Sequence, residues 1–95
     1  MMCVSDRVIR KRLVVRGQVQ GVFFRDSTRE QARRAGVAGW ARNRDDGAVE
    51  VVLEGPQDAV EQVVRFCESG PDSARVVSVE ADDEAPEGLS RFEIR

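Results

Sequence analysis

The stretch from Gly17 to Arg25 holds the residues best suited to chemistry in this 95-residue chain. Gly17 and Gly21 lie between a predicted strand and a predicted helix, where backbone N–H groups and the helix dipole together favour an anion. Arg25 follows in the first helical turn, and its guanidinium can hold two phosphate or carboxylate oxygens at once. The loop lacks both common nucleotide-binding spacings, so it predicts a site for a small anion. The plain alternative is that both glycines only turn the chain and Arg25 is a solvated helix residue.

Asn43 is the second candidate, because it ends a predicted strand just before a tight turn. An uncharged amide offers both donors and an acceptor, and so can hold a water molecule beside a phosphate that a carboxylate would repel. Asparagine is also common before turns because its side chain satisfies backbone groups there. From the residues alone, both interpretations of Asn43 stay open.

The composition excludes every mechanism that needs an imidazole, because the chain has no histidine. A Ser-His-Asp triad, a Cys-His dyad and a His-based zinc site are therefore unavailable within it. Cys3 and Cys67 are interpreted as buried or bystander thiols rather than as a disulfide framework. Five carboxylates are expected in turns, without a recognisable metal-ligand spacing: Asp45, Asp46, Asp82, Asp83 and Glu84. A metal site at these residues stays possible, but no spacing predicts one.

Length and composition predict one domain over residues 1–95, with residues 1–7 forming a frayed tail. With 41% apolar and 34% charged residues, the chain can bury a modest core. No apolar run approaches the roughly 20 residues that span a bilayer, and the first residues lack the pattern of a signal peptide. We expect a cytoplasmic protein without membrane contact.

Hydrophobic periodicity predicts the elements that position Arg25 and Asn43. A period of two predicts five strands: 9–16, 37–43, 48–54, 75–81 and a short one at 92–94. Apolar stripes predict two helices: 24–35, and a second one from Gly55-Pro56 to Gly70-Pro71. Asp46-Gly47 predicts a hairpin turn, and residues 82–88 predict an acidic link. This order predicts an α+β, ferredoxin-like (split β-α-β) two-layer sandwich, whose mixed, mostly antiparallel sheet of about four to five strands carries both helices on one face.

The remaining charged residues of the predicted strands are interpreted structurally. Arg10, Arg12 and Arg16 share one face of the first strand and could touch phosphates, although a solvated or helix-covered face with flat-packed stems is the ordinary interpretation. Glu50 and Glu54 are expected to point outward from the third strand.

Taken together, four stretches of this chain resemble the acylphosphatase family over about residues 8–95. They are the glycine loop that ends in Phe-Arg (14–25), the segment with Gly-Trp-x-x-Asn (36–43), and residues 46–51 and 54–56. The glycine loop and the Gly-Trp-x-x-Asn segment, at this spacing in the sequence, form a combination that is specific to the family. Phe24 and Ala41 depart from the Tyr and Val of many relatives, and neither is one of the two implied catalytic side chains.

The resemblance implies an enzyme that hydrolyses small acyl phosphates to a carboxylate and inorganic phosphate without a metal or cofactor. We expect no nucleic-acid partner, and a monomer is the simplest expectation for the oligomeric state. Arg25 and Asn43 are the implied catalytic residues: Arg25 binds the phosphoryl group, and Asn43 positions the attacking water. The implied substrate-binding residues, which act through backbone amides, are Gln20, Gly21, Val22, Phe23, Phe24 and Arg25.

Two alternatives stay open. Ferredoxin-like sheets also serve as binding modules for RNA or a small anion, where exposed aromatic side chains stack on bases. Here the strands offer only Trp40 and Phe92, and the pI is about 5.2, while Phe23, Phe24 and Trp40 are expected to pack in the core or loop. The other alternative is a non-catalytic accessory domain of a larger carbamoyl-transfer protein, against which the length of 95 residues argues.

Overall fold

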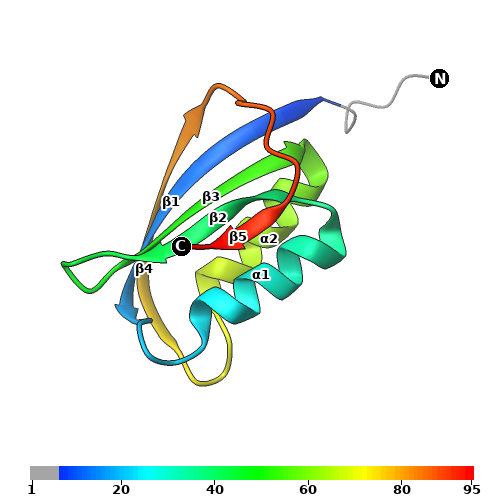
Figure 1. Cartoon of the computed structure of the whole chain (residues 1–95). Helices are drawn as coiled ribbons and strands as arrows, with labels where there is room; N and C mark the ends of the chain where they lie inside the picture. The colour runs from blue at the N-terminus through cyan, green and yellow to red at the C-terminus, as the bar shows by residue number, and fades with distance from the viewer. Residues whose placement is uncertain (1–6) are drawn as a thin grey trace.

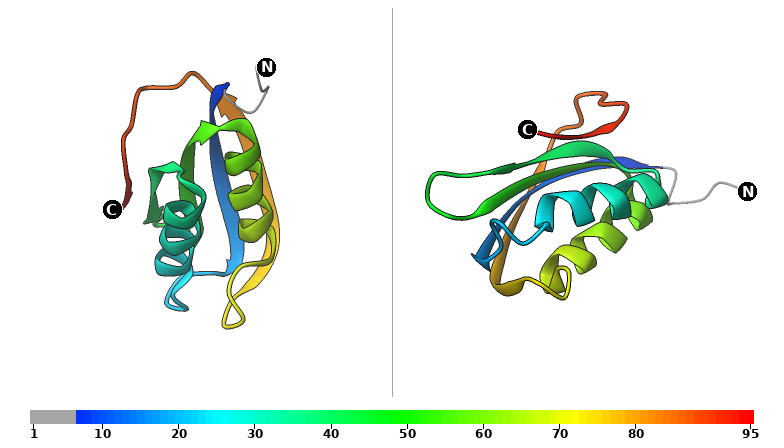
Figure 2. Two further views of the ribbon diagram at one scale, coloured as in Figure 1. Left: turned by 90° about the vertical axis from the view of Figure 1, so that its right-hand side faces the viewer. Right: turned by 60° about the horizontal axis from the view of Figure 1, so that its bottom comes forward.

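Two helices pack on one face of a five-stranded sheet in this computed structural model, which describes residues 7–95 (Figures 1 and 2). The elements in chain order are β1 (Val8–Gln18), α1 (Phe24–Ala35), β2 (Ala38–Asn43), β3 (Val49–Pro56), α2 (Gln57–Ser69), β4 (Arg75–Glu84) and β5 (Phe92–Ile94). The strand order in the sheet is β4-β1-β3-β2-β5, with all neighbours antiparallel except β2 and β5. The predicted ferredoxin-like α+β fold is confirmed.

The core lies between the sheet and the two helices, where the predicted apolar stripes meet. Helix α1 buries Phe24, Thr28 and Ala32, and α2 buries its own apolar stripe at a spacing of three to four residues. The sheet contributes Leu13, Val15, Ala41, Val49, Val51 and Leu53 to the same core. Each fully buried side chain of this size stabilises the fold by about 1.5–3 kcal/mol.

Cys67 confirms the expectation of a buried thiol. Its side chain is fully buried, and its Sγ lies 3.9 Å from Thr28 Oγ1 across the two helices. Burial raises the pKa of the Cys67 thiol to about 12, so it stays protonated at neutral pH. Cys3 and most of the tail expected over residues 1–7 lie outside the described residues; at Arg7, the carbonyl accepts the N–H of Gln57 at 3.1 Å.

Two predicted boundaries are wrong because strands continue through glycines. Strand β1 bulges between Arg16 and Gly17 and then pairs Gly17 with Val76, so the loop begins at Val19. A Cβ on Gly17 would lie 2.1 Å from the carbonyl oxygen of Arg75, and its φ is 134°, which only glycine accommodates. Strand β3 likewise runs through Gly55 and Pro56, so helix α2 begins one residue later.

The predicted acidic link is wrong at its start, because Asp82, Asp83 and Glu84 belong to β4 rather than to a turn. They lie opposite basic residues of β1 in the sheet register. Glu84 accepts from Arg10 Nε at 2.9 Å and from Arg12 Nε at 2.6 Å. Opposite charges across a strand pair stabilise it, which offsets the low strand preference of acidic residues.

The sheet face away from the helices is neither fully solvated nor covered by a helix, which were the two ordinary interpretations of the β1 arginines, but is partly buried. Arg10, Glu50 and Glu54 retain only 4%, 5% and 3% exposure. The segment between β4 and β5 crosses this face (Figure 1) and donates the N–H groups of residues 87–89 to Glu54 at 2.7–3.0 Å. Glu50 is paired by Arg12 and Arg42. Each of these buried charges has a partner of opposite sign, so none of them is left unpaired on this face.

Neither α1 nor α2 is long and apolar enough to cross a membrane.

Candidate active site

The loop between β1 and α1 has an unusual backbone. Gly21 has φ 75°, and Phe23, two residues later, has φ 62° and ψ 24°, the left-handed helical region. A bulky residue rarely adopts this conformation, and burial does not explain it because the Phe23 side chain is 73% exposed. Residues that alternate between left- and right-handed conformations turn successive N–H groups toward one concavity that suits an anion.

The N–H groups of this loop and of the first helical turn are free. Within residues 7–95, no main-chain N–H of residues 20–26 donates a hydrogen bond of normal geometry to a protein acceptor. Helix α1 has no side-chain cap at Phe23, although the first N–H groups of a helix lack partners inside it. The helix dipole adds partial positive charge at the same place. The loop therefore offers a set of unused donors to an anion.

A cavity of about 230 Å³ lies beside these donors and brings Arg25 and Asn43 together. Its lining residues are Val19, Gly21, Phe23, Phe24, Arg25, Asp26 and Asn43. Four of the six predicted substrate-binding residues line this cavity; Gln20 and Val22 do not. Val22 turns its carbonyl away to accept a hydrogen bond from Ser73 Oγ at 2.7 Å, and the side chain of Gln20 is bonded elsewhere.

Arg25 and Asn43 reach the cavity from different elements. Arg25 is the second residue of α1, and its Nη1 donates to the main-chain carbonyl of Arg95 at 3.2 Å. Asn43 is the last residue of β2, where it pairs with Val49 of β3, and its side chain is exposed. The sheet therefore holds Asn43 in place while its amide stays available to water.

Asp26 and Val19 are wall residues that the sequence did not identify. Val19 is almost fully buried. It follows the end of β1, so the period-two pattern of that strand did not indicate its burial. Asp26 is the acidic residue of the first turn of α1, a common helix-start signal, and its carboxylate pairs with Arg29 at 3.3 Å. The Arg29 guanidinium offsets part of the negative charge that Asp26 brings to the cavity wall.

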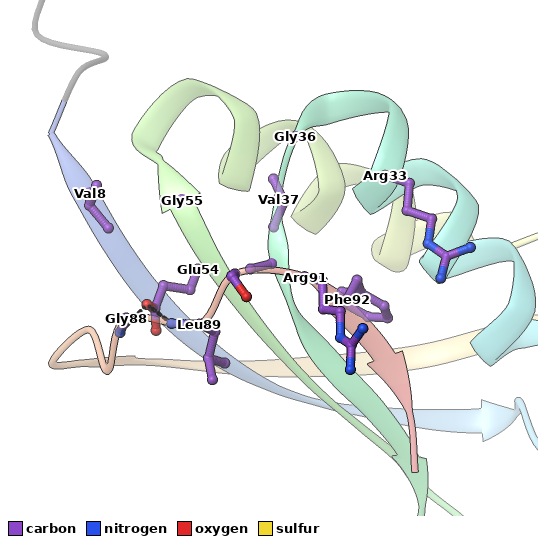
Figure 3. A pocket seen from close by; sticks show the side chains of 12 residues that line it. Val8, Arg33, Gly36, Val37, Glu54, Gly55, Gly88, Leu89, Arg91 and Phe92 are labelled. Carbon is purple, nitrogen blue, oxygen red and sulfur yellow. Dashed lines mark hydrogen bonds between the residues drawn. The ribbon is translucent and has the colours of Figure 1, made fainter.

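A larger cavity of about 490 Å³ opens at the other end of α1, beside the segment before β5 (Figure 3). Its lining includes apolar Val8, Leu89 and Phe92 and the carboxylate of Glu54. The N–H groups nearest to that carboxylate are already donated to it. Arg33 and Arg91 also line this cavity, but the N–H groups beside Glu54 are used and its wall carries a carboxylate. The smaller cavity combines an arginine with unused N–H groups.

The aromatic side chains of the sheet do not form a stacking platform. Trp40 is 8% and Phe92 1% exposed. Two guanidinium groups lie over the Trp40 ring, with Arg12 Cζ at 5.5 Å and Arg95 Cζ at 4.7 Å from its centroid. Bases stack on exposed rings, so the alternative of an RNA-binding sheet loses its main support. The predicted packing of Phe24 and Trp40 is confirmed, whereas Phe23 is exposed.

No group of three or more Cys, Asp or Glu side chains within residues 7–95 is arranged to hold a metal ion. Of the five carboxylates expected in turns, Asp46 lies in the β2–β3 turn as expected. The N–H of Ala48, together with Arg16 and Arg44, holds the pKa of the Asp46 carboxyl below its usual range.

Comparisons with known proteins show which family the chain resembles in sequence and fold. A family model described as Acylphosphatase matches residues 11–94. An acylphosphatase of Rubrobacter xylanophilus is 56% identical over 87 residues, which cover 90% of this chain and 79% of that protein. One of Natronomonas pharaonis is 52% identical over 92 residues, covering 97% and 99% of the two chains. The crystal structure of acylphosphatase from Bacillus subtilis superimposes with a TM-score of 0.88 at 36% identity, covering 92% of this chain and 98% of that one.

Proposed function

The chain belongs to the acylphosphatase family, and we propose that it hydrolyses small acyl phosphates to a carboxylate and inorganic phosphate in the cavity beside the β1–α1 loop. One observation carries the proposal. Unused N–H donors, the Arg25 guanidinium and the Asn43 amide all border a single cavity of about 230 Å³. These three kinds of group are what a phosphoryl group and an attacking water need.

Arg25 and the loop amides bind the phosphoryl group in this proposal. Phosphoryl transfer spreads charge over three non-bridging oxygens and asks the protein mainly for positioning and charge stabilisation. The planar guanidinium can hold two of these oxygens at once, and the N–H groups that follow Gln20 reach the others. Because these donors are fixed by the loop before the substrate arrives, little reorganisation is needed in the transition state.

Asn43 positions the water. Its amide group can hold the water by hydrogen bonds, because it offers both donors and an acceptor. A carboxylate at this position would repel the phosphate. The water oxygen forms a bond to phosphorus, while the bond from phosphorus to the acyl oxygen breaks and leaves its electron pair on the carboxylate. The proton of the water passes to a phosphoryl oxygen.

The leaving group explains why a site without an acid is sufficient. A carboxylate leaving group has a conjugate acid with a pKa of roughly 4, so it departs without being protonated. A phosphate monoester would release an alkoxide and would need a general acid. The chain has no histidine, and the Cys67 thiol is buried in the core with a pKa of about 12. The site therefore favours acyl phosphates over monoesters.

We further propose that residues 1–95 act as a single, monomeric, metal-independent domain in the cytoplasm. The donors described above already supply the positive charge that a metal ion would otherwise contribute at the phosphoryl group. Size-exclusion chromatography tests the oligomeric state, and fractionation of cells that produce the protein tests its location.

The test of function compares two substrates with protein that has been treated with a chelator. We expect phosphate release from acetyl phosphate at a rate that the chelator does not change, and none above background from a simple alkyl phosphate. Equal rates on both substrates would contradict the leaving-group argument. Loss of activity with the chelator, restored by a divalent cation, would contradict metal independence.

A further inference from the structure

The side chain of Gln20 joins the two halves of the candidate site. Its Nε2 donates to the main-chain carbonyl of Arg44 at 2.7 Å and to that of Ala48 at 2.9 Å. These carbonyls stand at the two ends of the β2–β3 turn, and Arg44 directly follows Asn43. One half-buried amide therefore ties the phosphate-binding loop to the residue next to the water-positioning side chain.

The turn does not need Gln20 in order to close. The N–H of Arg44 donates to the carbonyl of Ala48 at 2.8 Å, and the N–H of Gly47 donates to the carbonyl of Arg44 at 3.2 Å. Asp46 Oδ1 also accepts the N–H of Ala48 at 3.1 Å. Because the hairpin is closed by its own bonds, the two bonds from Gln20 fix the loop relative to the turn rather than shaping the turn itself.

Ser73 braces the same loop from the opposite side. Its Oγ donates to the carbonyl of Val22 at 2.7 Å from the connection between α2 and β4. The loop is thus attached at Gln20 toward Asn43 and at Val22 away from it. Ser73 provides a matched control, because its bond supports the loop without reaching the turn.

We propose that the Gln20 side chain is a positioning residue that sets the loop N–H groups relative to Asn43, and that it does not contact the substrate. An amide NH₂ group has two hydrogens, and both are used by the two carbonyls. Gln20 is also absent from the lining of the cavity. Misplacing a reacting group by about 1 Å can cost roughly 100-fold in rate. A link between the N–H donors for phosphate and Asn43 therefore affects turnover more than substrate binding. This inference rests on the proposed function.

The first experiment replaces Gln20 by methionine, which is similar in size but cannot donate to the carbonyls of Arg44 and Ala48. For Gln20→Met we expect kcat with acetyl phosphate to fall about 10-fold or more, because the loop and Asn43 lose their alignment. KM and the inhibition constant of inorganic phosphate should change less than about 3-fold, because the loop donors and Arg25 remain. Ser73→Ala should lower kcat less than Gln20→Met does. A larger change in phosphate inhibition than in kcat would overturn the inference.

Gln20→Glu adds a readout that depends on pH. An ionised carboxyl cannot donate to the two carbonyls, whereas a protonated one donates a single hydrogen. We expect the kcat of Gln20→Glu, relative to the unsubstituted protein, to recover partly as the pH is lowered from about 8 to about 5. This variant also keeps the test decisive if Gln20→Met does not fold. A relative kcat that is independent of pH would contradict a role for the donated hydrogens.

A double-mutant cycle with Asn43→Ala separates this inference from the proposed function. If Gln20 acts through Asn43, Gln20→Met should cost less than about 2-fold in kcat when Asn43→Ala is already present. Fully additive effects, or an unchanged kcat in Gln20→Met alone, would overturn the inference while leaving the proposed function in place. An unchanged kcat in Asn43→Ala would overturn both.

Discussion

Arg10 and Glu54 form a buried ion pair across β1 and β3, with Nη1 and Oε1 3.3 Å apart and side-chain exposures of 4% and 3%. Glu54 also accepts the N–H groups of residues 87–89. One carboxylate therefore anchors the segment that leads to β5. Because β5 pairs with β2, and the carbonyl of Arg95 just beyond it accepts from Arg25, this distant ion pair helps to hold one wall of the site.

Glu54→Gln should destabilise the fold strongly. The substitution leaves the Arg10 charge without its buried partner. It also replaces an ionised acceptor of three N–H groups by a neutral amide. Breaking a buried pair costs about 3–5 kcal/mol, which Glu84, the second partner of Arg10, reduces to about 2–3 kcal/mol. Urea unfolding measures this difference. Glu30→Gln is the control, because its exposed pair with Arg34 contributes at most about 0.5 kcal/mol. Equal effects of the two variants would show that Glu54 is not an anchor.

The same carboxylates predict how stability depends on pH. Burial by itself would raise the pKa of Glu54, but the N–H groups of residues 87–89 and Arg10 hold that pKa below its ordinary value. Burial likewise opposes a lowering at Glu50, where Arg42 and Arg12 prevail and hold the pKa low. A carboxyl whose pKa is lowered by folding stabilises the fold above its unfolded pKa, about 4.3 for Glu, and loses this contribution as the pH falls through the folded value.

We therefore expect the free energy of unfolding to be nearly constant from about pH 7 to pH 5.5 and to decline steeply below about pH 4. Urea titrations across this range test the expectation. The decline should be shallower in Glu54→Gln, which lacks one of the titrating groups. A free energy of unfolding that increases on acidification below pH 4 would contradict the assignment.

The sequence predicted the strands and helices well, because they depend on local signals. The period of two in β3 and the helical stripe of α2 were sufficient to predict the sheet and its covering layer. Arg25 and Asn43 were proposed as site residues because each lies at the end of an element beside a turn signal, and the structure places both at one cavity.

The charged face of the sheet could not be predicted, because its burial depends on contacts between distant residues. Glu54 and Arg10 are 44 positions apart in the chain, and Glu84 and Arg10 are 74 apart. The alternation of β3 correctly placed Glu54 on the face away from the helices. It could not show that residues 85–91 cross that face, because they carry no periodic pattern. The left-handed backbone of Phe23 was missed for a related reason, since that conformation has no signal at a phenylalanine.

Phe23→Gly should stabilise the protein while impairing the site. The left-handed conformation costs a non-glycine residue about 1–2 kcal/mol, and the side chain is exposed, so little packing is lost. Glycine loses about 0.5–1 kcal/mol more in backbone entropy on folding, which leaves a net gain of about 0.5–1 kcal/mol. Val77→Gly is the matched control: Val77 is 76% exposed but lies in β4, where glycine should destabilise. Kinetics should show a lower kcat for Phe23→Gly, because a more flexible loop holds its N–H groups less firmly. A loss of stability in Phe23→Gly would show that Phe23 is not strained.

Arg25→Lys should weaken phosphate binding although the positive charge is kept. An ammonium group is a point charge and cannot reproduce the two parallel bonds of the guanidinium. Losing one charge-assisted hydrogen bond costs about 1.5–3 kcal/mol, which corresponds to a decrease of roughly 10- to 100-fold in kcat/KM. The inhibition constant of inorganic phosphate should increase in parallel. Arg29→Lys, one turn further along α1 and outside the cavity lining, should behave like the unsubstituted protein. Equal kcat/KM values for Arg25→Lys and Arg29→Lys would remove Arg25 from the phosphate site.

Asn43→Ala should reduce turnover without disturbing the fold or phosphate binding. The side chain is exposed, and β2 keeps its pairing with β3 through the main chain, so the midpoint of urea unfolding should not change. If Asn43 positions the water only as the reaction proceeds, its loss should cost about 3 kcal/mol, as for a lost oxyanion donor, and so lower kcat by roughly 100-fold. Asn43→Asp keeps the shape but adds a negative charge, and should also raise the inhibition constant of inorganic phosphate. Steady-state kinetics of both variants, with phosphate as the inhibitor, separate the two effects. A lower phosphate affinity in Asn43→Ala, with kcat unchanged, would make Asn43 a phosphate ligand rather than the residue that positions the water.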